Sequence, residues 1–436
     1  MTWRNNESNK QSALKTLFIC ISTMQLFVLI ALLVIVSAIY SYINARFVKL
    51  PGTIGIITIA IIGSVLTVIA DHLDPDIGQR LMSVAKEINF STIVLNILLG
   101  FLLFAGSFNA NTKRLKKEMR PVFILSTLSV LLSAGIFGLL FHYLGDWLHV
   151  RIPLIYCFLF GALISPTDPV SVGNIIKTSK LPVNLSTIIA GESLFNDGIG
   201  LVLFITILEA IRSGSDNVDL TKTGLLFLRE VFGGIALGVI LGIIGHRLMK
   251  TITDFQTIVL VSLSLVMSIS LIGAWLELSI PLAAVSAGLF VGDNSINLND
   301  SERSHEALEK FWHLVDEMLN TVLFVLIGLQ MVNLPYLTNY WITGSLSIVL
   351  ILVARWFSIF VPLIFLRRSL QVNYSNINIL TWAGVRGGIS IALALSLPAS
   401  HYRHIILSAC YFVVIFSIIV QGLSLNRVIR HSLSKK

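Results

Sequence analysis

The sequence contains little charge. Only 12% of its 436 residues are Asp, Glu, Lys or Arg, which is about half of the roughly 25% that a soluble globular domain carries. Apolar residues make up 55%, above the roughly 45–50% typical of soluble domains. A chain with so few charges cannot cover a water-facing surface, which argues against a soluble enzyme, a nucleic-acid-binding protein and a disordered chain. We therefore expect a membrane protein with much of its surface in lipid.

Cysteine is scarce as well. Cys20, Cys157 and Cys410 each lie inside an apolar run, and no Cys-x-x-Cys or Cys/His spacing occurs, so we expect inert side chains without redox or metal chemistry. A membrane-embedded hydrolase would need a nucleophile with an activating base or a metal site, and no His-x-x-Glu-His pattern is present. We therefore expect neither an enzyme nor a cofactor.

Long apolar runs are what the sequence has in abundance. A membrane span takes about 20 apolar residues, and runs bounded by charge, Pro and Gly predict thirteen helices, with a tight hairpin between the eighth and ninth. The runs cover residues 17–40, 53–70, 90–108, 121–145, 153–173, 183–210, 223–247, 256–275, 278–292, 311–331, 342–366, 376–397 and 403–426. The mixed polar stretch 292–310 is expected to form a surface helix between spans. The sequence thus predicts an all-α polytopic membrane protein.

The positions of the cations predict an orientation. Lys and Arg are enriched in cytoplasmic loops, and alternate loops of the predicted topology hold nineteen cations against nine. We expect the protein in the cytoplasmic membrane. If the loops richer in cations are cytoplasmic, the N-terminus lies outside the cell and the C-terminus lies in the cytoplasm. The basic balance is thereby explained by topology and anionic lipid, without nucleic acid. The expected domains are an N-terminal tail (1–16), a transmembrane domain (17–428) and a short cytoplasmic tail (429–436).

A few charges fall where charge is costly. Arg355 and Arg386 lie near the middle of their spans, where insertion costs about 2.5–3.5 kcal/mol even on a lenient scale. Asp168, Glu192 and Asp197 also lie within apolar segments. Because ionisable groups inside a membrane are usually functional and paired, we interpret these five residues as one constellation rather than as a structural ion-pair network.

Helical spacing arranges the polar residues around Glu192 and Asp197. Glu192 and Asn196 are four residues apart and share one stripe of a helix, and Ser193 and Asp197 share the neighbouring stripe. A carboxylate and a hydroxyl one turn apart can supply two ligands to a small hard cation. A glutamate one turn from an amide is better suited to holding an arginine.

Two spans are expected to be broken. Pro166 and Pro169 flank Thr167 and Asp168, removing two backbone donors and leaving carbonyls unpaired, which lipid tolerates only where they line a cavity or meet an ion. In the twelfth span Gly384 and Gly387 interrupt the helix beside Arg386. Interrupted spans in both halves of a chain point to the binding site of an inverted-repeat secondary transporter.

These segments resemble one transporter family. Thr167-Asp168-Pro169, the run Gly191-Glu-Ser-Leu-Phe-Asn-Asp197 and the turn Gly384-Val-Arg-Gly387 are similar to motifs of the cation:proton antiporter-1 family, which includes NhaP-type sodium/proton antiporters and animal sodium/proton exchangers. The resemblance covers about residues 17–428 in span number and motif order. It implies a thirteen-span fold with inverted repeats, a six-helix core bundle with two crossed broken helices, and a dimerisation domain. It also implies a homodimer that works as an elevator.

The resemblance further implies a role for each residue. Asp197 would be the main ion and proton carboxylate, and Asp168, Ser193 and the backbone oxygen of Thr167 would complete a Na⁺ site. Beside it, Glu192, Asn196 and Arg355 would form a structural clamp, and Arg386 would stabilise the crossing formed around Pro166, Pro169, Gly384 and Gly387. The sequence leaves open whether Arg355 or Arg386 pairs with Glu192.

The expected function is exchange of Na⁺, or Li⁺, for protons at a midplane carboxylate by alternating access. In this family an Asn directly before the ion-binding Asp is typical of electroneutral exchange. The resemblance therefore implies that Asn196 makes the exchange electroneutral. A potassium/proton antiporter would share the same motifs and stays as an alternative. A cation channel would need a continuous polar pore and a filter, which the sequence does not contain. Monovalent cations, protons, membrane lipid and a second copy of the chain are the expected partners.

Overall fold

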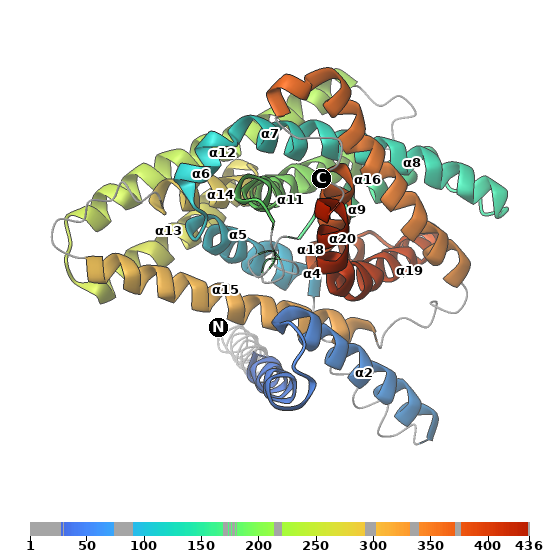
Figure 1. Cartoon of the computed structure of the whole chain (residues 1–436), viewed down its shortest axis with the longest axis horizontal. Helices are drawn as coiled ribbons and strands as arrows, with labels where there is room; N and C mark the ends of the chain where they lie inside the picture. The colour runs from blue at the N-terminus through green and yellow to red at the C-terminus, as the bar shows by residue number, and fades with distance from the viewer. Residues whose placement is uncertain are drawn as a thin grey trace, which may run out of the picture. The chain divides into compact units, whose positions relative to one another are not determined.

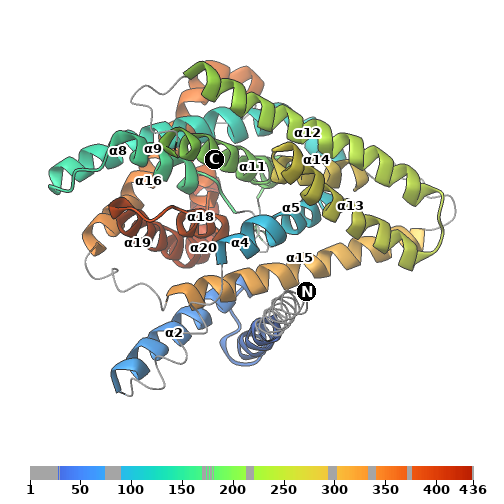
Figure 2. The same ribbon diagram turned by 180° about the vertical axis from the view of Figure 1, so that it is seen from behind.

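The computed structural model describes residues 28, 30–73, 90–168, 173, 176, 179, 181–212, 220–292, 302–331, 340–370 and 376–434. Within these ranges the regular secondary structure is entirely helical (Figure 1 and, from behind, Figure 2), which confirms the all-α prediction. The expected N-terminal tail over 1–16 and Pro169 lie outside the described residues.

The chain divides into two compact units. The first comprises Met1–Ile88 and Phe324–Asn333, and its described helices are the span Ile30–Val48, which ends in the π-helix η1 (Asn44–Val48), and α2 (Gly52–Leu73). In this unit α2 packs closely on the last turns of α15 (Glu302–Met331). The Ser64 hydroxyl donates a hydrogen bond to the carbonyl of Gly328, and a Cβ on Gly328 would collide with the Cβ of Ala60.

The second unit, Asn89–Leu323 and Leu334–Lys436, contains every residue of the predicted site. Besides the larger part of α15, its helices are α4 (Phe90–Ile93), η2 (Val94–Leu98), α5 (Leu99–Phe108), α6 (Thr112–Lys117), α7 (Met119–Ile124), η3 (Leu125–Ser129), α8 (Val130–Trp147), α9 (Leu154–Ile164), α11 (Val183–Arg212), α12 (Leu220–Lys250), α13 (Phe255–Leu276), α14 (Ile280–Val291), α16 (Trp341–Leu370), α17 (Ile377–Ala383), α18 (Gly388–Leu395), α19 (His401–Phe416), η5 (Ser417–Gln421) and α20 (Gly422–Ser434).

Eight of the described helices are long and apolar enough to cross a membrane, and the bent pair α17–α18 would make nine. Four shorter apolar helices accompany them. Large apolar side chains remain exposed on the long helices, such as Trp275 on α13 (81% exposed) and Phe365 on α16 (80% exposed), as expected where the neighbour is lipid. The chain is therefore a multi-pass membrane protein, while the count of thirteen spans stays a prediction.

Glycine allows the helices to approach closely. A Cβ on Gly238 of α12 would collide with the carbonyl of Ala283 on α14, and a Cβ on Gly161 of α9 would collide with the carbonyl of Ala134 on α8. Without a hydrophobic driving force between helices in lipid, small residues that allow backbones to approach supply the packing energy. These contacts help to fix the helices around the site.

Most helix boundaries follow the predicted runs, and three segments differ. The first is the span from Ile30, which continues to Val48, past the predicted end at residue 40. The tight hairpin is confirmed, since α13 ends at Leu276, Glu277 has a left-handed φ of 55°, and α14 begins at Ile280. The polar stretch before residue 311 is not a separate helix in its described part, because α15 continues unbroken from Glu302 through a sequence rich in helix-forming residues. The last helix also continues beyond the predicted end at residue 426, to Ser434, with Ile429 buried on its inner side.

Candidate functional site

The polar run of α11 forms one face of the candidate site. This helix is continuous from Val183 to Arg212, so the predicted stripes are formed. Glu192, Ser193, Asn196 and Asp197 are all buried, with exposed fractions of 2%, 2%, 0% and 4%. Four polar side chains removed from solvent on successive turns need partners from other helices, because an unpaired buried polar group costs free energy.

The first partner is the unwound end of α9. The helix ends at Ile164, and residues 165–168 continue without helical structure, as Pro166 predicts. The chain can approach α11 here because Gly200 has no side chain, and a Cβ on it would collide with the ring of Pro166. The break therefore brings Thr167 and Asp168 to the polar face of α11.

Thr167 is held by three hydrogen bonds to α11. Its backbone N–H donates to Oδ1 of Asn196 at 3.3 Å, and Nδ2 of Asn196 donates to its Oγ1 at 2.7 Å. Its Oγ1 also lies 2.9 Å from Oγ of Ser193. The Asn196 side chain, which the resemblance placed with Glu192, therefore joins α11 to the broken segment.

The second broken span meets the first. Between α17 and α18 the chain unwinds over residues 384–387 and bends by 53°, which confirms the predicted interruption. The backbone N–H of Asp168 donates to the carbonyl of Val385 at 2.7 Å. A Cβ on Gly387 would lie 2.5 Å from Oδ2 of Asp168, so glycine is required for this close approach of the carboxylate.

Glu192 pairs with Arg355 of α16. Nη2 of Arg355 lies 2.5 Å from Oε1 of Glu192, and both side chains are 2% exposed. The guanidinium also lies against the second break, since a Cβ on Gly384 would be 3.0 Å from Nε of Arg355. Arg355 thus touches both α11 and the break between α17 and α18.

Arg386 lies in the second break itself. It is 2% exposed, and its Nη1 donates to the carbonyl of Gly384 at 3.1 Å, while its backbone N–H donates to Oγ of Ser417 at 3.1 Å. Asp197 interacts electrostatically with both Asp168 and Arg386. Arg355 therefore forms the ion pair with Glu192, and Arg386 lies within electrostatic range of both Glu192 and Asp197.

The arrangement offers oxygens of several kinds. The carboxylates of Asp168 and Asp197, the hydroxyls of Thr167 and Ser193 and backbone carbonyls of the unwound segments belong to the region where α9, α11 and α18 contact one another. Such hard oxygen ligands suit a hard cation. Within the described residues no three His, Cys, Asp or Glu side chains are grouped as metal ligands, so a cation here would need hydroxyl or carbonyl oxygens besides the carboxylates.

Some polar residues near the site were missed by the sequence analysis. Ser417 and Gln421 are buried at the second break, with exposed fractions of 1% and 2%. Asp316 on α15 interacts electrostatically with Asp168 and accepts a hydrogen bond from Asn320 at 2.9 Å. Ser417 and Gln421 are four residues apart inside an apolar run, and so are Asp316 and Asn320. This spacing was the sequence signal that could have identified them as buried polar pairs.

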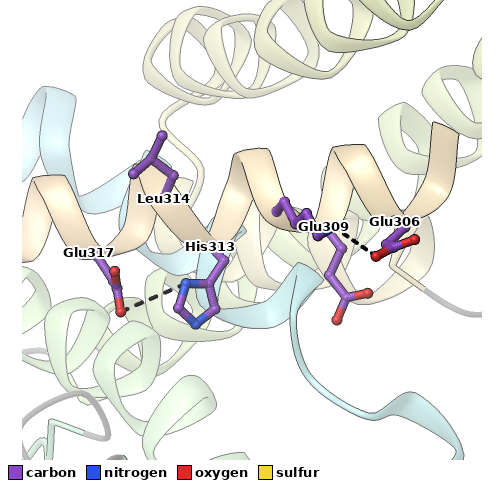
Figure 3. Close-up of a pocket in the computed structure, with 6 residues that line it drawn as sticks. Glu306, Glu309, His313, Leu314 and Glu317 are labelled. Carbon is purple, nitrogen blue, oxygen red and sulfur yellow. Dashed lines mark ion pairs between the residues drawn. The ribbon is translucent and has the colours of Figure 1, made fainter. Parts of the chain in front are cut away.

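The outer face of α15 carries a hollow of about 480 Å³ (Figure 3). The described residues that line it come from one helix: Glu306, Glu309, Lys310, His313, Leu314 and Glu317. Lys310 pairs with Glu306 at 2.7 Å and His313 with Glu317 at 3.8 Å. Such exposed pairs one turn apart are ordinary features of a solvated helix, and none of the predicted site residues lines this hollow.

Comparison with known proteins identifies relatives over nearly the whole chain. The family model described as the transmembrane sodium/hydrogen exchanger matches residues 29–431. The Na(+)/H(+) antiporter NhaP of Pseudomonas aeruginosa is 37% identical over 410 residues, covering 92% of this chain and 96% of the relative. The Na(+)/H(+) antiporter NhaH of Halobacillus aidingensis is 30% identical, covering 93% of this chain and 97% of the relative.

The fold is also similar to a solved structure. The sodium proton antiporter MjNhaP1 from Methanocaldococcus jannaschii superposes with a TM-score of 0.73 at 19% identity, covering 94% of this chain and 98% of the other. At this identity the likeness concerns the fold alone. The family match and the close bacterial relatives show that this chain belongs to the sodium/hydrogen exchanger family.

Proposed function

We propose that the protein exchanges Na⁺ for protons across the cytoplasmic membrane, with Asp197 as the carboxylate that holds either ion. The relatives are named as Na(+)/H(+) antiporters, and none of these names supports the potassium alternative. The observation that carries the proposal is the position of Asp197, which is 4% exposed and lies within electrostatic range of Asp168 at the first break and Arg386 in the second.

The mechanism follows from burial. A carboxylate removed from water is costly as an uncompensated charge, so Asp197 is stable either with a proton or beside a cation. Na⁺ would bind Asp197, Asp168, the Ser193 hydroxyl and the Thr167 carbonyl. Because the two ions compete for one group, a carrier that changes its accessible side only when loaded exchanges them, in the direction set by the steeper gradient.

The remaining residues would hold this site in place. The Glu192–Arg355 pair joins α11 to α16, the Asn196–Thr167 bonds join α11 to the end of α9, and Arg386 supports the second break. Alternating access, a homodimer and a cytoplasmic C-terminus belong to the same proposal. Asn196 in front of Asp197 would make the exchange electroneutral.

The decisive experiment is exchange in proteoliposomes under an imposed pH difference, with Na⁺, Li⁺ and K⁺ added in turn. Wild-type protein should dissipate the gradient with Na⁺ or Li⁺, and Asp197→Asn, which removes the charge with little change of shape, should abolish this. Exchange that survives Asp197→Asn would refute the site. A strong response of the rate to an imposed membrane potential would refute electroneutrality while leaving the exchange itself in place.

A further inference from the structure

One peptide group at the second break is hydrogen-bonded on both sides. The carbonyl of Val385 and the N–H of Arg386 belong to the same peptide bond and point in opposite directions. The carbonyl accepts from the N–H of Asp168 at 2.7 Å, and the N–H donates to Oγ of Ser417 at 3.1 Å. This peptide therefore connects the backbone of a predicted ion ligand to the last transmembrane helix.

The connection continues beyond Ser417. Its hydroxyl donates a hydrogen bond to Oε1 of Gln421, and both side chains are buried. Every donor in this series points the same way, from Asp168 to Val385, from Arg386 to Ser417 and from Ser417 to Gln421. Hydrogen bonds in such a chain polarise one another and strengthen in a low-dielectric interior.

Gln421 also holds the end of α17. Its Nε2 donates to the carbonyl of Trp382 at 3.4 Å, one of the carbonyls left without a helical partner because α17 ends at Ala383. The indole N–H of Trp382 in turn donates to Oγ of Ser424 at 2.8 Å. The break is therefore bonded to the C-terminal helix at two points, the Trp382 carbonyl and the Val385–Arg386 peptide.

The local geometry of the last helix fits this role. Ser417–Gln421 is a π-helical turn between α19 and α20, and single π-turns inside α-helices are frequent at functional sites. The turn contains both side chains of the bonded series. An apolar span has no packing reason to bury a serine and a glutamine here, whereas a break with unpaired backbone groups does.

We propose that Ser417 and Gln421 are positioning residues for the ion site, which hold the backbone of Asp168 at the second break through the Val385–Arg386 peptide without touching the ion. This inference rests on the proposed function. It adds the last transmembrane helix to the residues that determine how well the site binds Na⁺. A positioning role of this kind predicts a change in Na⁺ affinity rather than a loss of the transport cycle.

The test is Ser417→Ala, measured as Na⁺-dependent exchange in proteoliposomes. Losing the two hydrogen bonds of the Ser417 hydroxyl, one accepted from Arg386 and one donated to Gln421, should raise the Na⁺ concentration for half-maximal exchange by about five- to tenfold, with the maximal rate within about twofold of wild type. Gln421→Leu, which removes the far end of the series, should change the half-maximal concentration in the same direction. It also provides the measurement if Ser417→Ala does not fold.

The matched control is Ser408→Ala in α19. Ser408 is 1% exposed, and its hydroxyl makes no hydrogen bond to any residue that the structure describes, so this variant should exchange Na⁺ with wild-type affinity. The inference is overturned if Ser417→Ala and Gln421→Leu keep the wild-type half-maximal concentration, or if Ser408→Ala shifts it equally. Wild-type protein without any exchange would instead refute the proposed function, so the two failures are distinguishable.

Discussion

Two ion pairs of nearly equal length show how burial changes what a charge does. Arg355 and Glu192 are 2.5 Å apart, and Lys310 and Glu306 are 2.7 Å apart. The side chains of the first pair are 2% exposed, whereas those of the second are 74% and 65% exposed. Removing one partner leaves an unpaired charge in a low dielectric in the first case and a solvated group in the second. The distance between the charges therefore does not measure their importance.

The largest expected effect comes from breaking the buried pair. Glu192→Ala leaves the Arg355 guanidinium buried without its carboxylate, which should lower the free energy of unfolding by about 3–5 kcal/mol. The measurement is thermal unfolding in detergent together with the yield of monodisperse protein. Glu306→Ala is the matched control and should leave both unchanged, because exposed pairs one turn apart contribute little. Equal losses in the two variants would contradict the comparison.

Removing both buried charges should lower the free energy of unfolding by less than the sum of the two single losses. Glu192→Ala combined with Arg355→Ala leaves no unpaired charge, so the loss should fall short of the sum of the two single losses by about 1–3 kcal/mol. The same double-mutant cycle on Glu306 and Lys310 should show additive effects. Additivity at Glu192 and Arg355 would mean that they do not act as a pair.

An added side-chain atom at the broken segment should also lower the stability of the fold. Gly200→Ala would place a methyl group against Pro166 and destabilise the fold by about 1–3 kcal/mol through overpacking. Gly135 of α8 is the control, because a Cβ there would meet no atom of the described part of the chain within 4 Å, and Gly135→Ala should be neutral or stabilise the helix by up to about 1 kcal/mol. Thermal unfolding of both variants measures the difference in stability. A Gly200→Ala variant as stable as wild type would contradict this prediction.

The sequence predicts the elements of the site better than their contacts. The positions of Glu192, Asn196 and Asp197 on one helix follow from a spacing of four and five residues, and the breaks follow from Pro166 and Gly384. That Asn196 bonds Thr167 depends instead on how the unwound end of α9 approaches α11, which no local pattern encodes.

The two arginines illustrate the same limit. Arg355 and Arg386 have similar positions in their spans, so composition and spacing leave their partners open. The ion pair of Arg355 with Glu192 arises because the Arg355 side chain reaches from α16 to α11, with its guanidinium against the second break. Ser417 and Gln421 were overlooked for a related reason, because two polar residues in an apolar span gain meaning only when the break beside them is seen.

The smallest effect is expected in the loop between α12 and α13, where Asp254 caps α13. The Thr257 N–H and hydroxyl donate to its Oδ2 at 2.8 and 2.6 Å, and these bonds hold the pKa of the fully exposed Asp254 carboxyl below its usual value. A lowered pKa in the folded state contributes stability above the usual pKa of Asp and loses it as the pH falls through the folded pKa. Asp254→Asn keeps a capping acceptor but no titrating group, so its melting temperature should decline slightly less than that of wild type between neutral and strongly acidic pH. Because the Asp254 carboxyl is in water, this difference in stability should be far smaller than the loss caused by Glu192→Ala. A difference of similar size would show that exposure does not govern how much a charge contributes to the stability of this protein.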